Sequence, residues 1–147
     1  MYKDLLAASQ FPDWNPRNFL DVGEMTYAFA IGYDWLFDVW TSRQKQVIKQ
    51  AIMEKGLLRA MLFYEKLVPP KATGVHFPTT TSNWNSVCNG GITVGALAIA
   101  DVEPLLANEI IKNAVKSVPI LPLMVTFLYA LPLFHVSHRS KSEWRMK

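Results

Sequence analysis

The sequence predicts an all-α fold built of antiparallel helical hairpins, arranged as an α/α solenoid or toroid. Three observations carry this prediction. Apolar residues recur at helical spacing through residues 19–40, a capping-box signal follows at Thr41–Gln44, and a run of small and aliphatic residues over 83–100 leads into another helix. Half of the 147 residues are hydrophobic and only 18% are charged, which suits a large core and argues against disorder.

The first 40 residues predict a short helix and a long one. Residues 2–9 provide one or two helical turns, and Pro12 and Pro16 then disfavour helix in the residues before them. Asn18 is placed to cap a helix that runs from Phe19 to about Trp40. One apolar face of this helix carries Val22, Met25, Phe29, Leu36 and Trp40, and a second carries Tyr27, Ile31 and Trp35. We expect burial on both sides, inside a larger helical assembly.

The capping box begins the second half of the first hairpin. In Thr41-Ser42-Arg43-Gln44, Thr is followed three residues later by Gln, the pattern that satisfies free N–H groups at a helix start. A helix is expected from Ser42 to about Lys55. Gly56 weakens it, and residues 57–67 resume as a further helical piece or a bent continuation. Because the link at Trp40-Thr41 is short, the two helices are antiparallel neighbours.

The second hairpin follows a loop. Residues 69–82 hold three Pro, a Gly and four Thr, and include His76, which is either an ordinary solvated or locally bonded histidine or part of a site. A helix then runs from Asn83 or Trp84 to Ala100. Pro104 opens the last helix, which ends near Ser117, and Asp101 or Glu103 favours its start. The hairpins therefore span about 19–67 and 83–117, within a domain of residues 1–117.

The tail, residues 118–147, differs from everything before it. Residues 118–136 contain no Asp, Glu, Lys or Arg, and basic residues follow. This length approaches the roughly 20 residues that cross a bilayer, but Pro119, Pro122 and Pro132 argue against a membrane helix. A third interpretation is that the tail is frameshifted, since one back-translation of Leu123–Phe127 reads Asp-Gly-Asn-Phe in a neighbouring frame.

Charge and cysteine content restrict the function classes. The formal net charge of +3 comes from basic residues that are scattered until the last nine, so we expect no nucleic-acid partner. Cys88 is the single cysteine, which gives no internal disulfide and no zinc spacing, and it is expected to be a small buried thiol. We expect no metal and no cofactor. The first six residues show no secretory signal.

Two stretches resemble the helical domain of heparinase II/III-like polysaccharide lyases. The first joins Phe11-Pro12-Asp13-Trp14-Asn15 to Phe19–Val22 and Ile31–Leu36; the second joins Ser82-Asn83-Trp84-Asn85 to Val87–Gly91 and Gly95–Asp101. The resemblance covers roughly residues 2–117. It implies part of an α/α toroid from a longer protein that cleaves acidic, uronic-acid-containing polysaccharides by β-elimination, typically in the periplasm or outside the cell. The chain departs from the family near Val118, as a truncated or frameshifted gene fragment would.

The candidate site lies at the start of the helix over residues 83–100. Asn83, Asn85 and Asn89 are amides near a helix N-terminus, where the free N–H groups and the helix dipole favour an anion such as a carboxylate. By resemblance, Asn83 matches an asparagine that binds the substrate carboxylate. Trp84 stands where many members carry His and is suited to stack on a sugar ring. The alternatives are that Asn83 is a plain N-cap and Trp84 a core residue.

The expected function is that of an inactive lyase fragment. β-Elimination needs a neutralised substrate carboxylate, a base and an acid. The family's catalytic Tyr and His have no matching positions here, and His135 and His138 match nothing. Two alternatives stay open: a non-catalytic helical carbohydrate-binding or scaffold module, and a small protein anchored by a membrane helix in residues 118–136.

Overall fold

The chain is all-α, as the sequence predicts. A computed structural model describes residues 2–67 and 76–118, and within these ranges every regular element is a helix. The elements in chain order are α1 (Tyr2–Ser9), α2 (Leu20–Trp35), α3 (Ser42–Ala51), a π-helix (Ile52–Leu57), α4 (Leu58–Tyr64), a 3-10 turn (Phe77–Thr79), α6 (Asn83–Ala98) and α7 (Pro104–Ser117). The expected tail lies outside the described residues, apart from Val118.

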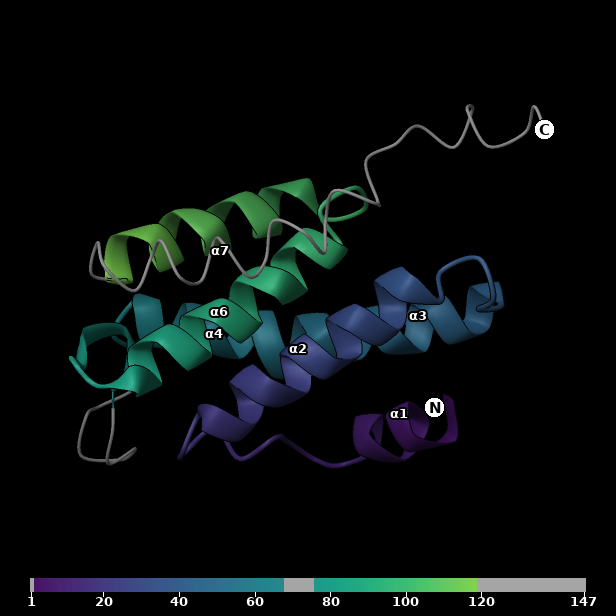
Figure 1. Cartoon of the computed structure of the whole chain (residues 1–147), viewed down its shortest axis with the longest axis horizontal. Coiled ribbons are helices and arrows are strands. Elements are labelled where there is room, and N and C mark those ends of the chain that lie inside the picture. Colours follow the sequence, from purple (N-terminus) through teal and green to yellow (C-terminus); the bar gives the residue numbers. More distant parts are fainter. Residues whose placement is uncertain (1, 68–75, 119–147) are drawn as a thin grey trace.

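The helices form two hairpins whose first members lie side by side. Figure 1 shows α2 and α6 running in the same direction, while the α3–π–α4 rod behind them and α7 run the opposite way. The most extensive contact of α2 is with α6, and α6 packs in turn on α7 and the π-helix. The two predicted antiparallel hairpins are therefore confirmed, and closure into a toroid stays a prediction.

Helix α2 begins and ends differently from the prediction. Asn18 is not its cap: Phe19 precedes the helix in a left-handed conformation (φ 62°), and no side chain caps the start. The helix stops at Trp35, and residues 36–40 form a turn. Trp40 folds back so that its Nε1 donates to Gly32 O over 2.8 Å. This bond satisfies one of the carbonyls that the last helical turn leaves free.

Only one of the two apolar faces of α2 is buried. Val22 and Phe29 are fully enclosed, whereas Tyr27 is 40% exposed and Trp35 is 62% exposed. The expectation of burial on both sides is wrong for the described part of the chain, because no described helix packs over the second face.

The second half of the first hairpin is one continuous rod. The capping box is confirmed: Gln44 N donates to Thr41 Oγ1 and Thr41 N donates to Gln44 Oε1. The helix does not break at Gly56 but widens into the π-helix, which is the bent continuation that the sequence left open. Thr26 of α2 sits against this widened turn, since a Cβ at Gly56 would overlap its hydroxyl.

The contact between α2 and α6 depends on glycine. A Cβ at Gly91 would fall far inside the van der Waals radius of Gly23 O, and one at Gly23 would lie 3.0 Å from Cys88 Cα. One turn further along, Gly95 leaves room for Thr26 Cγ2, while Thr26 Oγ1 donates to Val22 O over 2.6 Å. The two backbones thus approach more closely than any larger residue permits.

An ion pair links the two hairpins. Pro104 opens α7 as predicted, but the Glu103 side chain does not cap the helix. Instead its carboxylate accepts a 2.8 Å hydrogen bond from Lys49 Nζ on α3. Asp101 lies in the exposed turn before α7.

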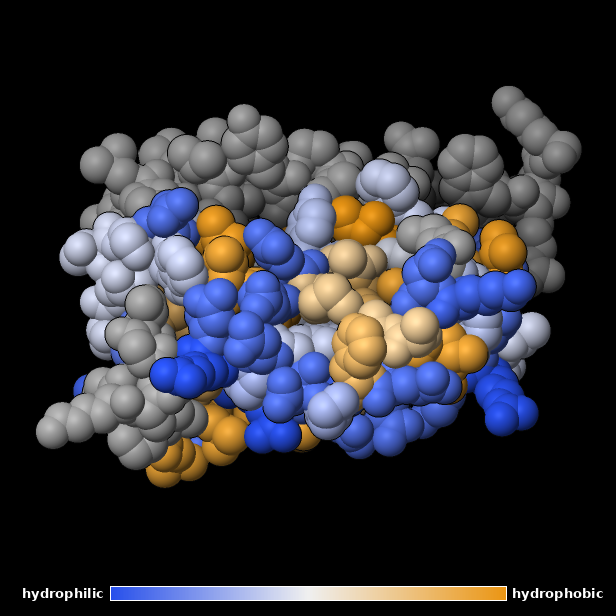
Figure 2. Space-filling model, turned by 90° about the horizontal axis from the view of Figure 1, so that it is seen from below, coloured by the Kyte–Doolittle hydropathy of each residue, from blue (hydrophilic) through white to orange (hydrophobic). Residues whose placement is uncertain are grey.

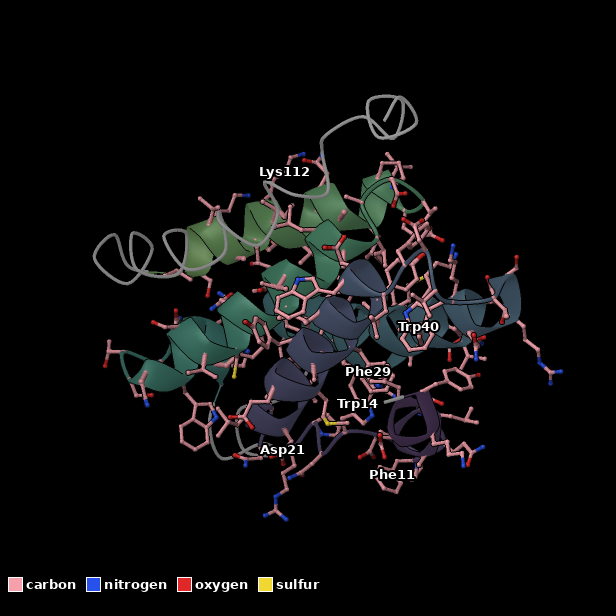
Figure 3. All side chains as sticks on the ribbon, turned by 45° about the vertical axis from the view of Figure 1, so that its right-hand side comes forward. Phe11, Trp14, Asp21, Phe29, Trp40 and Lys112 are labelled. Carbon is pink, nitrogen blue, oxygen red and sulfur yellow. The ribbon has the colours of Figure 1, made fainter. Side chains whose placement is uncertain are left out.

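The amino-terminal segment, which contains α1 and Trp14, packs against the outside of the first hairpin. Trp14 is buried against Phe29, with ring centroids 4.7 Å apart, and its Nε1 donates to Ala8 O in α1. Figure 3 shows this pair between α1 and α2, with Phe11 pointing outward. Lys55 Nζ donates a hydrogen bond to Phe11 O.

On the face of the molecule that Figure 2 shows, apolar side chains reach the surface in a central area bordered by hydrophilic residues.

No helix in residues 2–67 and 76–118 is long and apolar enough to span a bilayer. The predicted membrane candidate, residues 118–136, lies almost wholly outside these ranges, so that alternative stays a prediction.

Replacing Gly91 by Ala should lower the stability of the folded chain. The new methyl group would meet the Gly23 backbone, which cannot rotate away, so we expect a loss of about 2 kcal/mol or more in the free energy of unfolding. Urea denaturation followed by circular dichroism measures it. The matched control is Gly90→Ala, one residue away and partly exposed, which should be neutral or stabilising by up to about 1 kcal/mol. Equal stability of the two variants would contradict the proposed close contact.

Candidate functional site

The candidate site lies at the amino end of α6, where several elements meet. Ser82 occupies the N-cap position and Asn83 is the first helical residue. The carboxyl ends of α4 and α7 and the 3-10 turn gather at the same end, through contacts of Tyr64, Ser117 and Pro78 with α6 or with one another. Beneath them lies an aromatic cluster in which Phe19 stacks on Phe77 at 4.3 Å.

A buried hydrogen-bond network joins these elements. Asn85 Nδ2 donates to Phe77 O at 3.0 Å and to Ser117 O at 3.1 Å. Asn89 Nδ2 donates to Asn85 O at 2.8 Å and also lies 3.1 Å from Ser117 Oγ. The Tyr64 hydroxyl donates to Asn89 Oδ1 at 2.7 Å, and Ser117 Oγ donates to Pro78 O at 2.8 Å.

Asn85 and Asn89 therefore have a structural role. Their exposed fractions are 2% and 1%, and both amides are bonded within the chain. The predicted direct contact of these two residues with a substrate does not fit this burial. Among the described residues, no buried side-chain polar atom lacks a partner, and a fully satisfied network of this kind rigidifies its surroundings.

Asn83 is the asparagine that faces solvent. Its side chain is exposed and forms no hydrogen bond with any described residue. The alternative that it is the N-cap is wrong by one position, since Ser82 holds that place and its side chain caps nothing. Asn83 thus presents an amide beside the first backbone N–H groups of a 16-residue helix, which favour an anion.

Trp84 combines burial with partial exposure. It packs against the core, and its Nε1 donates to Asn18 O across 66 residues of sequence at 2.9 Å. This bond fixes the segment that leads into α2. The core role is thereby established for part of the ring, and stacking on a sugar stays a prediction.

His76 forms a local hydrogen bond, which agrees with the interpretation of it as an ordinary histidine and not as part of a site. Its Nδ1 lies 3.1 Å from Thr79 Oγ1, and its ring is 5.7 Å from that of Phe63. It precedes the 3-10 turn and is half-buried. A substrate contact by His76 stays a prediction.

The buried ionisable groups nearby are held neutral. Burial raises the pKa of the Tyr64 hydroxyl far above its ordinary value, with a smaller contribution from Cys88. Burial likewise raises the pKa of the Cys88 thiol to about 12, and its Sγ contacts Phe19 O at 3.5 Å, so the expected small buried thiol is confirmed. A hydrogen-bonded phenol with a raised pKa is poorly suited to act as a base at neutral pH.

Sequence reasoning missed Tyr64 and Ser117. Each is the last residue of its helix, and no spacing in the sequence links either of them to Asn85 or Asn89.

In residues 2–67 and 76–118, no group of His, Cys, Asp and Glu is arranged to hold a metal ion. His135 and His138 lie outside the described residues.

Comparison with known proteins adds no relative: no protein-family model matches the sequence, and no curated protein matches it.

Replacing Asn85 by Ala should destabilise the chain strongly. The change removes several hydrogen bonds and leaves the Phe77 and Ser117 carbonyls without this donor, so we expect a loss of about 3 kcal/mol in the free energy of unfolding. Urea titration measures the loss. Asn83→Ala, two residues earlier and exposed, is the matched control and should change stability by less than about 0.5 kcal/mol. A mild effect at Asn85 would show that the network contributes little.

Proposed function

We propose that this chain is part of the helical domain of a heparinase II/III-like polysaccharide lyase and forms one wall of its carbohydrate cleft. The observation that carries the proposal is the exposed Asn83 amide at the start of α6, next to the partly exposed ring of Trp84. A carboxylate-binding amide beside an aromatic surface is the pair of features that a uronic acid requires, because its ring carries both an anion and apolar C–H faces.

The arrangement of the helices supports the same proposal. Two hairpins with their first helices parallel and in contact are the repeating unit from which α/α solenoids and toroids are built. The buried network below Asn83 holds the start of α6 rigidly against α4 and α7. A helix start that is already held in place loses little conformational freedom when a ligand binds.

A basic residue beside the segment that Trp84 contacts adds charge of the right sign. Arg17 is exposed and directly precedes Asn18, whose carbonyl is bonded by Trp84. A guanidinium group recognises carboxylates and sulfates by bidentate hydrogen bonds. We therefore propose an acidic, uronic-acid-containing polysaccharide as the ligand.

We propose no lyase activity for the chain by itself. The Tyr64 hydroxyl of the described site donates a hydrogen bond to Asn89 Oδ1 and has a raised pKa, so it keeps its proton at neutral pH. The reaction also needs an acid for the leaving oxygen, and His76 is bonded to Thr79. The surface is therefore proposed to bind substrate, with the acid and base supplied by the rest of a longer protein.

The test is polyanion binding by a pair of isosteric variants. Asn83→Asp removes the amide donor and places a negative charge against the ligand carboxylate, so alginate and heparin should bind about tenfold more weakly by titration calorimetry. The helix start tolerates the aspartate, because an acidic residue there is stabilising. Asn108→Asp, exposed on α7, makes the same change in charge elsewhere and should leave binding unchanged. Neutral dextran should not bind.

Two results would overturn the proposal. Equal binding by the two variants would remove Asn83 from the site. If the purified chain is incubated with alginate or heparin and the ultraviolet absorbance of unsaturated sugar products rises steadily, the chain is a complete enzyme.

A second candidate is a non-catalytic scaffold module. The exposed rings of Tyr27 and Trp35 favour it, because aromatic surface left open on a helix is typical of interaction sites. A chain that binds none of the polymers but forms one defined oligomer by light scattering would favour this candidate.

A further inference from the structure

The second apolar face of α2 is an uncovered stripe. Tyr27, Ile31 and Trp35 follow one another at intervals of four residues and so lie along one side of the helix, which we name the outer α2 stripe. Tyr27 and Trp35 are exposed and Ile31 is half-buried. On its other sides α2 packs against α6, α3 and the π-helix. A stripe of this length on a helix is an apolar surface that a further segment can cover.

The charged residues in the stretch of sequence that carries the stripe all have one sign. Between residues 18 and 42 the sequence has four charged residues, and every one is acidic: Asp21, Glu24, Asp34 and Asp38. Glu24 precedes Tyr27 by one helical turn, and Asp38 follows Trp35 by three residues; both are exposed. Asp21 is placed at the start of α2 in Figure 3. A second copy of this chain would set acidic residues against acidic residues, which disfavours self-association through the stripe.

The sequence contains one segment with the complementary chemistry. Residues 118–136 carry no charged residue, and the basic cluster Arg139, Lys141, Arg145 and Lys147 follows. Pro119, Pro122 and Pro132 disfavour a regular helix in this segment, so it is poorly suited to bury its apolar side chains against itself. An apolar stretch followed by cations matches an apolar stripe bordered by carboxylates.

The start of this segment lies close enough to reach the stripe. Ser117 is bonded to Asn85 and Asn89 of α6, and α6 packs directly on α2. The end of α7 is therefore one helix removed from α2, at the amino end of α6, and the stripe lies further along α2. The 19 residues of 118–136 can span roughly 60 Å when extended, which is enough to reach it. The stripe is about 12 Å long at 1.5 Å per helical residue, and an extended chain covers that distance in about four residues.

We propose that the carboxyl-terminal segment, residues 119–147, docks on the outer α2 stripe of its own chain. Its apolar part covers Tyr27, Ile31 and Trp35, and its basic cluster pairs with the acidic border. This inference does not depend on polysaccharide binding, because the stripe and the amino end of α6 involve different side chains.

The test is photo-crosslinking in the full chain. Ala28 is exposed beside the stripe, and an Ala28→Cys variant can be labelled with a benzophenone maleimide while buried Cys88 stays unlabelled. Irradiation, proteolysis and mass spectrometry should then show links from position 28 to peptides from residues 119–136 in monomeric protein. Arg59→Cys, exposed on α4, is the matched control and should give no such links.

Charge reversal tests the acidic border. Combining Asp34→Lys with Asp38→Lys should remove most of the crosslink, and adding Arg139→Glu with Lys141→Glu should restore it. Links that join two chains, seen as a covalent dimer, would overturn the proposal in favour of a second copy. Equal crosslinking from positions 28 and 59, or none from position 28, would also overturn it.

Discussion

The close approach of α2 and α6 is the constraint on which the rest of the structure depends. At Gly23 and Gly91 the two backbones touch with no room for a Cβ, and one turn later Thr26 fills the space left by Gly56 and Gly95. This one side chain therefore contacts both the partner helix and the π-helix behind it. Because the glycines fix the spacing of the first helices of both hairpins, they also fix where α7 and the α3–π–α4 rod pack.

The polar end of the molecule follows from the same packing. With α6 held against α2, Trp84 reaches the Asn18 carbonyl, and Asn85 and Asn89 turn inward toward Ser117 and Tyr64. Three of the four candidate polar residues on α6 are thus used to hold the fold together. Of the three asparagines only Asn83 faces solvent, so the proposed ligand surface of Asn83 and the partly exposed Trp84 ring is narrow and rests on a rigid base. So narrow a surface fits one wall of a proposed cleft whose other walls are supplied by the rest of a longer protein.

Periodicity and capping chemistry predict most of the fold, because both are local properties. The capping box at Thr41, Pro104 at the start of α7 and the small-residue run of α6 each identify an element without knowledge of its neighbours. The predictions from sequence are wrong where tertiary contacts determine where a helix ends or which side chains are buried. Trp40 ends α2 by bonding Gly32, and Tyr27 and Trp35 look like core residues in sequence but lie outside. The pattern also identified the cluster of asparagines, but not which of them point inward, because that depends on Ser117 and Tyr64 from distant helices.

A double-mutant cycle on Thr26 and Gly95 tests the central contact most directly. Gly95→Ala should lower the free energy of unfolding by about 2 kcal/mol, since its methyl group would overlap Thr26 Cγ2. Thr26→Ser removes that methyl and keeps the hydroxyl that bonds Val22 O. In the Thr26→Ser background, Gly95→Ala should therefore cost at least about 1 kcal/mol less, a coupling well above the error of such cycles. Additive effects of the two substitutions would contradict the account that this contact sets the spacing of the helices.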